Sequence, residues 1–183
     1  MEGELALVLI YLRRSIVFSV IIYFFIYMML RRWREEISSF KMLCEYIFVG
    51  YIIMFLQVTL GGTIHRILNS NMALLRGKYL NVIPFYEIIR FIINKGNYER
   101  LIQFFLNILI CMPIGILLPL VFSERNWSLR KIFNVTVVVT FSVETIQYFT
   151  GRMADIDDII ANILGGLIGF IAIYMVRYYI NKR

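Results

Sequence analysis

Acidic and amide side chains interrupt the apolar stretches in the second half of this chain. Glu144 and Gln147 stand three residues apart in the segment VTFSVETIQYF, so a helix would place them on one face. An ionisable group inside an apolar helix is costly, and it is rare unless it has a partner or a use. The pair therefore marks either a functional site or a polar contact that locks two helices together.

A second set of polar residues opens the next apolar stretch, DIDDIIANILGGLIGF. Asp155, Asp158 and Asn162 recur every three or four residues, and Gly165 and Gly169 continue the same stripe of a helix. The two glycines form a GxxxG pattern, which predicts close packing against another helix. The acidic residues above them fit a functional role as well as a structural one.

A third apolar stretch adds Gln103 and Asn107. At a helical rise of 1.5 Å per residue, Asn107, Glu144 and Asn162 would each lie roughly 6–9 Å below the same membrane surface. Arg152 stands between Glu144 and the aspartates and is their expected counter-charge. This convergence predicts a polar pocket that opens on one side of the membrane. Its carboxylates could also hold a divalent cation, Mg²⁺ or Ca²⁺, through oxygen ligands.

The composition identifies the setting of these residues as a membrane. Of 183 residues, 60% are hydrophobic and 17% are charged, which excludes an ordinary soluble enzyme. The net charge of +7 comes from basic residues at the ends of apolar blocks, so it indicates membrane topology and not nucleic-acid binding. We expect an all-α polytopic membrane protein with about five spans. These are Ser15–Leu30, Leu43–Leu60, Leu101–Phe122, Ile132–Thr150 and Ile159–Ile180.

The basic residues also predict an orientation. Their numbers are nearly equal on the two sides, but one group is concentrated in short segments beside the membrane: Arg31–Met42, Ser123–Lys131 and the C-terminus. Short basic segments are retained in the cytoplasm. We therefore expect a cytoplasmic C-terminus, with the N-terminus, the Gly61–Arg100 loop and the Gly151–Asp158 turn outside. The first residues lack a basic region and a cleavage site, so we expect no signal peptide.

Four motifs follow one another in the order and spacing of a known family. They are NVIPF at 81–85, NILICMPIG at 107–115, ExxQ at 144–147 and RxxDxDDxxxNxxG at 152–165. Together they resemble the VanZ-like family of bacterial integral membrane proteins, over about residues 43–180. The resemblance implies a location in the bacterial cell membrane and a role in resistance to teicoplanin, a lipoglycopeptide. It implies no particular reaction.

The family core has four spans, so the resemblance implies two regions in this chain. Residues 43–183 would form the VanZ-like four-helix membrane domain. Residues 1–42 would add an N-terminal transmembrane helix and a basic cytoplasmic loop.

The segment Pro84–Asn94 predicts a short helix on the outer surface. Phe85, Ile88, Ile89 and Ile92 would share one side of it, and Pro84 suits the first helical position. Such an amphipathic helix would lie in the membrane interface, either as a lid over the pocket or as a plain connection.

Three functions remain open from the sequence. The first is a non-enzymatic protein that binds a lipid or a lipoglycopeptide at the outer leaflet. The second is an intramembrane enzyme that modifies a lipid head group or a lipid-linked cell-wall precursor, with Glu144 or Asp158 as general base and Arg152 holding a phosphate. The third and weakest is a small transporter or flippase subunit. No HExxH, GxSxG or P-loop motif is present, and His65 is the only histidine.

The predicted partners are membrane lipids and, for the two main hypotheses, a lipoglycopeptide or a lipid-linked precursor. The predicted binding residues are Asn107, Glu144, Gln147, Arg152, Asp155, Asp157, Asp158 and Asn162, with Asn81, Pro84 and Phe85 as the outer-loop motif. Glu144 and Asp158 are the candidates for catalysis, and no dedicated metal ligands are predicted.

Overall fold

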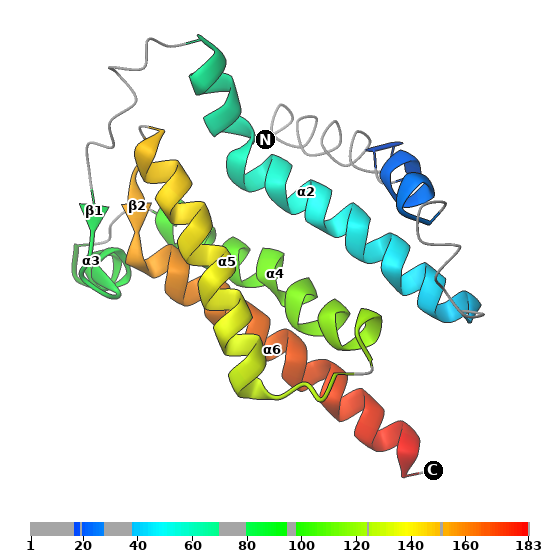
Figure 1. The fold of residues 1–183 in the computed structure, drawn as a ribbon. Helices are drawn as coiled ribbons and strands as arrows, with labels where there is room; N and C mark the ends of the chain where they lie inside the picture. The colour runs from blue at the N-terminus through cyan, green and yellow to red at the C-terminus, as the bar shows by residue number, and fades with distance from the viewer. Residues whose placement is uncertain are drawn as a thin grey trace.

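The structure is a computed structural model that describes residues 17–18, 20–27, 38–69, 80–94, 98–123, 125–150 and 152–182 (Figure 1). Five helices and two short strands have defined bounds. The helices are α2 (Ser39–Asn69), α3 (Tyr86–Asn94), α4 (Tyr98–Val121), α5 (Leu129–Phe149) and α6 (Ile156–Asn181). The strands are β1 (Leu80–Asn81) and β2 (Ala154–Asp155).

Four of the described helices are long and apolar enough to cross a membrane. The spans are Ser39–Leu60, Tyr98–Val121, Leu129–Phe149 and Ile156–Asn181, which confirms four of the five predicted ones and the all-α polytopic class. Of the remaining predicted span, Ser15–Leu30, the structure describes residues 17–18 and 20–27, which are helical, and the rest lies outside the described residues.

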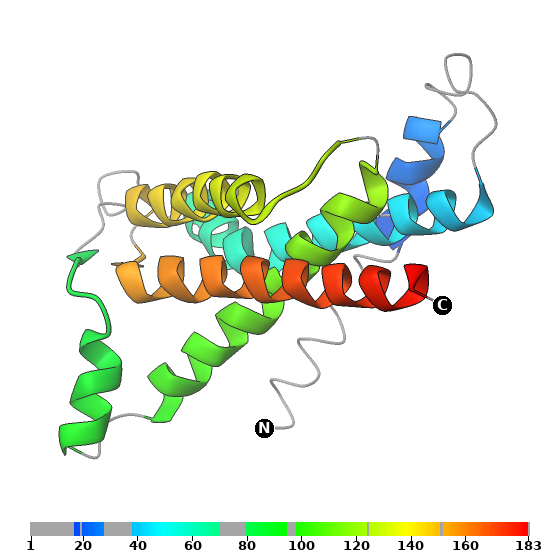
Figure 2. The ribbon, with the colours of Figure 1, turned by 90° about the horizontal axis from the view of Figure 1, so that it is seen from below.

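Glycines set the closest approach in the bundle, between α4 and α6 (Figure 2). A Cβ atom on Gly169 would come within 2.0 Å of the Met112 carbonyl oxygen, and one on Gly165 within 2.2 Å of the Ile108 carbonyl oxygen. From the other side, a Cβ on Gly115 would meet the Gly166 carbonyl oxygen at 2.0 Å. The helices touch backbone to backbone, as the GxxxG pattern predicts.

The interior is small and the outer surface is apolar. Buried side chains from four helices form the core: Tyr51, Phe55, Cys111, Ile114, Leu117, Leu118, Ile132, Val143 and Phe170. Large apolar side chains such as Leu109, Val138 and Phe141 are more than half exposed on the outside of the bundle. An apolar exterior of this extent is expected for a surface that faces lipid. Cys44 and Cys111 are both free and buried.

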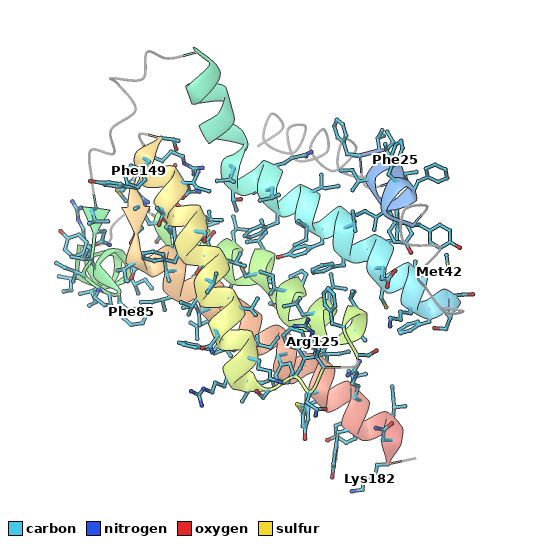
Figure 3. All side chains as sticks on the ribbon, viewed as in Figure 1. Phe25, Met42, Phe85, Arg125, Phe149 and Lys182 are labelled. Carbon is cyan, nitrogen blue, oxygen red and sulfur yellow. The ribbon has the colours of Figure 1, made fainter. Side chains whose placement is uncertain are left out.

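The alternating helices give the molecule two chemically different ends. We call one end the polar end. It contains Thr59 of α2, strand β1, the start of α4, the end of α5 and the start of α6. The loop before α5 and the last turns of α6 lie at the other, which we call the basic end. In Figure 3, Phe85 and Phe149 mark the polar end, whereas Arg125 and Lys182 mark the basic end. Within the described residues, the loop before α5 and the end of α6 share one end, and the segments before α3 and α6 share the other. The side of the membrane that each end faces stays a prediction.

A two-stranded parallel ladder closes the polar end. Leu80 pairs with Ala154 and Asn81 with Asp155, which joins the segment before α3 to the segment before α6. The helix predicted from Pro84 begins instead at Tyr86. The reason is Phe85, whose φ of 59° lies in the left-handed region and cannot belong to a right-handed helix. Pro84 is therefore a turn residue and not the first residue of the helix.

Candidate functional site: a carboxylate cluster at the polar end

Asp158 is held between α6 and α4 by two side-chain amides. Its Oδ1 atom accepts a hydrogen bond from Asn107 Nδ2 at 2.7 Å, and its Oδ2 atom accepts one from Gln103 Nε2 at 3.3 Å. Gln103 and Asn107 lie one turn apart on the same face of α4, so they clamp the carboxylate from one side. Both carboxylate oxygens are thereby engaged.

Asp155 connects three segments. As the N-cap of α6, its Oδ1 atom accepts a hydrogen bond from the backbone N–H of Asp157 at 3.0 Å. The same atom accepts a hydrogen bond from Asn81 Nδ2 at 2.8 Å, across the β1–β2 pair. Its own backbone N–H donates to Glu144 Oε2 at 3.2 Å. The Asp155 and Glu144 side chains are only 4% and 5% exposed.

The predicted outer-loop motif fastens onto these aspartates. Besides the Asn81 contact, the backbone N–H of Phe85 donates to Asp157 Oδ1. Asn81 Oδ1 in turn accepts a hydrogen bond from the backbone N–H of Ile83 at 3.1 Å, which shapes the turn before α3. The motif thus positions α3 beside the carboxylates, and Phe85, whose N–H bonds Asp157, has a left-handed φ of 59°.

Gln147 and Arg152 bind the same acceptor on α2. Gln147 Nε2 and Arg152 Nη1 donate to the Thr59 carbonyl oxygen at 2.9 and 2.8 Å. The backbone N–H of Arg152 also donates to the Gln147 carbonyl at 2.9 Å. The guanidinium charge acts on Glu144 and Asp158 through space, while its hydrogen bond ties the turn to α2.

Asn162 lies one helical turn beyond Asp158, away from the polar end. Its Oδ1 atom accepts a hydrogen bond from Cys111 Sγ at 3.2 Å, inside the α4–α6 contact. The residue that meets Asn107 is therefore Asp158 and not the Asn162 that depth counting placed at the same level. Asn162 is 6% exposed and Cys111 is fully buried.

Arg100 belongs to the same site and is absent from the predicted residues. It lies on the α4 face that carries Gln103 and Asn107, and its charge acts on Asp158. Its Nη2 atom lies 3.9 Å from Met153 Sδ. The spacing of residues 100, 103 and 107 is a helical signal that would have identified it.

The described side chains leave little free space here. A cavity of about 10 Å³ lies between Ile88 of α3, the first turns of α4 and the three aspartates, with room for about one water molecule. We name Glu144, Asp155, Asp157 and Asp158 together the carboxylate cluster. Among the described residues, no group of three or more histidine, cysteine or acidic side chains is arranged to hold a metal ion. Hydrogen-bond donors of the chain engage Glu144 Oε2, the Oδ1 atoms of Asp155 and Asp157, and both oxygens of Asp158.

The polar end contains more acidic than basic groups. Four carboxyl groups share the polar end with two guanidinium groups, those of Arg100 and Arg152. Such a site favours ligands that donate N–H groups or carry positive charge.

Comparisons with known proteins agree with the motifs. The family model described as VanZ/LLP1 matches residues 16–177. A protein from Enterococcus faecium, named Protein VanZ, is 30% identical over 105 residues, which cover 57% of this chain and 58% of that relative. The match therefore spans little more than half of the relative's length. No solved structure matches the chain significantly. The chain belongs to the VanZ/LLP1 family of proteins.

Proposed function

We propose that the protein binds an amphiphile, a membrane lipid or a lipoglycopeptide, at its polar end and thereby lowers susceptibility to teicoplanin-type antibiotics. The resemblance to VanZ-like proteins supplies the link to teicoplanin. The carboxylate cluster supplies the chemistry, because ligands with ammonium or amide N–H groups make strong hydrogen bonds to carboxylates. The proposal also places this end outside the cytoplasm, as the charge distribution predicts.

The observation that carries the proposal is how the cluster is covered. Asn81 and Phe85, both in the segment before α3, donate hydrogen bonds to Asp155 and Asp157. If this segment lifts, those acceptors become available to N–H donors of a ligand. We name β1, the turn after it and α3 (residues 80–94) the flap. The 10 Å³ cavity below it would open into the binding site.

The apolar face of the flap favours an amphiphilic ligand. Ile89 is 50% exposed and Ile93 is 71% exposed, so α3 presents apolar surface beside a polar cluster. A lipid-tailed ligand gains about 0.8 kcal/mol for each CH₂ that it buries in the membrane. The tail would hold its polar part at the depth of the cluster, so teicoplanin should bind better than vancomycin, which has no lipid tail.

An enzyme is the alternative. The two arginines could hold a phosphate, and Glu144 or Asp158 could accept a proton. Asp158 accepts an amide hydrogen bond on each oxygen, so its carboxylate is held toward α4 and only its remaining lone pairs could take a proton. This arrangement favours binding over acid–base chemistry. No observation on the described residues favours a transporter.

The test compares binding and catalysis on the same variants. Glu144→Gln removes the charge of a residue whose carboxylate accepts a single backbone N–H, a bond that an amide oxygen can still accept. Thr145→Ala is the matched control, because its hydroxyl bonds back to the Phe141 carbonyl of its own helix. The measurements are the affinity for teicoplanin and vancomycin in nanodiscs, resistance in a susceptible host, and the amount of protein in the membrane.

We expect Glu144→Gln to weaken teicoplanin binding by about tenfold or more, since a hydrogen bond to a charged group contributes about 1.5–3 kcal/mol. Resistance should fall in parallel at normal abundance, and Thr145→Ala should match the wild type. Equal binding of both antibiotics, or unchanged binding by Glu144→Gln, would contradict the proposal. A changed pool of lipids or cell-wall precursors in cells with the wild-type protein would support the enzyme instead.

A further inference from the structure

The basic end contains a cavity much larger than the one beside the carboxylate cluster. A space of about 630 Å³ lies between the loop that precedes α5 and the last turns of α6. Figure 3 labels Arg125 in that loop and Lys182 at the end of α6. The volume lies in the range of about 300–1,000 Å³ that is usual for small-molecule sites.

Three cationic side chains line this cavity. Arg125 comes from the loop, and Arg177 and Lys182 come from α6. Among the described residues that line it, none is acidic. Positive charge from two separate elements therefore converges on one space, and such a space attracts an anion.

Arg177 is fixed in place by the end of α4. Its Nη2 atom donates to the Pro119 carbonyl at 3.1 Å. That carbonyl lies in the last turn of α4, where backbone oxygens have no partner within the helix. A guanidinium group has five N–H donors, so this one bond orients it and leaves other donors for an anion. The Lys182 ammonium lies 5.8 Å from the centre of the Tyr178 ring, which holds it beside the cavity.

The remaining walls are aromatic and apolar. Trp127 and Tyr174 line the cavity on opposite elements, and Phe170 and Ile173 line its inner part. The indole N–H of Trp127 donates to the Phe122 carbonyl at 2.9 Å, so the ring is anchored to the end of α4. Tryptophan and tyrosine gather where a membrane meets water. A ligand here would have a phosphate among cations and apolar atoms against the inner wall.

We propose that this cavity binds the phosphate head group of an anionic phospholipid from the leaflet that meets the basic end. Basic pockets between transmembrane helices bind such head groups. The apolar inner wall favours a lipid over a free phosphate, because it accommodates the glycerol and the first acyl carbons. The site lies at the opposite end from the carboxylate cluster, so its failure and that of the proposed function are separable.

The test measures lipid retention by the purified, delipidated protein. Dioleoyl-phosphatidylglycerol is titrated in detergent and bound lipid is counted by native mass spectrometry, with dioleoyl-phosphatidylcholine as the zwitterionic comparison. The variant is Arg125→Gln with Lys182→Gln, which leaves the Arg177–Pro119 contact in place. Arg130→Gln is the control, because Arg130 is exposed in the first turn of α5 and does not line the cavity. Thermal unfolding without added lipid checks the fold of each variant.

We expect the wild type to retain phosphatidylglycerol at least tenfold more strongly than phosphatidylcholine. Each cation contributes about fivefold, equivalent to about 1 kcal/mol, so the double variant should lose at least tenfold. Arg130→Gln should change retention less than twofold. Soluble glycerol phosphate should compete only weakly. Equal retention by the double variant, an equal loss in Arg130→Gln, or full competition by glycerol phosphate would each overturn the proposal. If the double variant does not fold, Arg125→Gln alone gives the same comparison.

Discussion

Asp158 and Glu144 differ in the hydrogen-bond donors that surround their carboxylates. Both oxygens of Asp158 accept amide hydrogens from α4, whereas Glu144 accepts one backbone N–H through Oε2. Replacing either residue by its amide removes one charge, but the hydrogen-bonding consequences differ. An amide at 158 would present an NH₂ group to Gln103 or Asn107, which are themselves donors there.

We therefore predict that Asp158→Asn destabilises the protein by about 1 kcal/mol, because a partly buried amide donor loses its acceptor. Glu144→Gln should cost less, since its amide oxygen can still accept the Asp155 N–H. Thermal unfolding in detergent measures both. The swap Asp158→Asn with Asn107→Asp restores a donor–acceptor pair at 2.7 Å and should recover part of the loss. A swap no more stable than Asp158→Asn alone would show that the pair is not what stabilises this position.

Sequence patterns do not reveal contacts between residues that lie far apart along the chain. Helical spacing groups Asp155, Asp158 and Asn162 on one stripe, and in the structure Asp155 caps α6 while the other two lie near its start. The same spacing does not reveal that Asn81 bonds Asp155, because 74 residues separate them. It also gives neither the left-handed φ of Phe85 nor the contact of its N–H with Asp157. Local periodicity predicts faces, whereas partners depend on the tertiary fold.

At the scale of elements, the α4–α6 contact depends on glycine. A methyl group on Gly169 would meet a backbone carbonyl, which cannot move aside as a side chain can. We predict that Gly169→Ala lowers the free energy of unfolding by about 1–3 kcal/mol, the usual cost of overpacking. Ile168→Ala changes the adjacent residue, which is 43% exposed, and serves as the control. Equal stability of Gly169→Ala and the wild type would contradict the close contact of the two backbones.

Long apolar elements were predictable and short polar ones were not. Four spans follow from the length of apolar sequence that a bilayer requires, and the structure has helices there. The strands β1 and β2 have two residues each, too few for any periodic signal. The start of α3 at Tyr86 depends on the backbone of Phe85, which no propensity indicates. The sequence therefore predicted the bundle but not the ladder that holds the flap against it.

The flap should respond to loss of its anchor without loss of the bundle. Asn81 bonds both Asp155 and the backbone of Ile83. We predict that Asn81→Ala speeds hydrogen exchange of the α3 amides at least fivefold, since lost hydrogen bonds favour local opening. Exchange in the middle of α4 and α6 should not change. Val82→Ala is the control, because Val82 is 63% exposed in the same turn. Unchanged exchange in α3 would show that other contacts hold the flap.

At the scale of the whole molecule, the two ends have opposite chemistry. One gathers carboxylates and amides, and the other gathers arginine, lysine and aromatic side chains. A chain that crosses the membrane repeatedly must alternate sides, and this alternation puts the loop before α5 and the end of α6 at one end. Absolute orientation rests on the positive-inside rule, which places the basic end in the cytoplasm. Both proposals take their biological meaning from that assignment.

Thiol labelling of single-cysteine variants measures which end of the protein faces the cytoplasm. Val82→Cys lies at the polar end and Ser128→Cys at the basic end, and both native side chains are exposed. The natural cysteines give little background, since Cys44 is 5% exposed and Cys111 is fully buried. In intact cells, we predict that a membrane-impermeant thiol reagent labels Val82→Cys at least tenfold more than Ser128→Cys. Permeabilised cells should label both, which controls for reactivity. Labelling of Ser128→Cys alone would invert the topology, place the carboxylate cluster inside the cell and remove the basis for capture of an antibiotic at the outer leaflet.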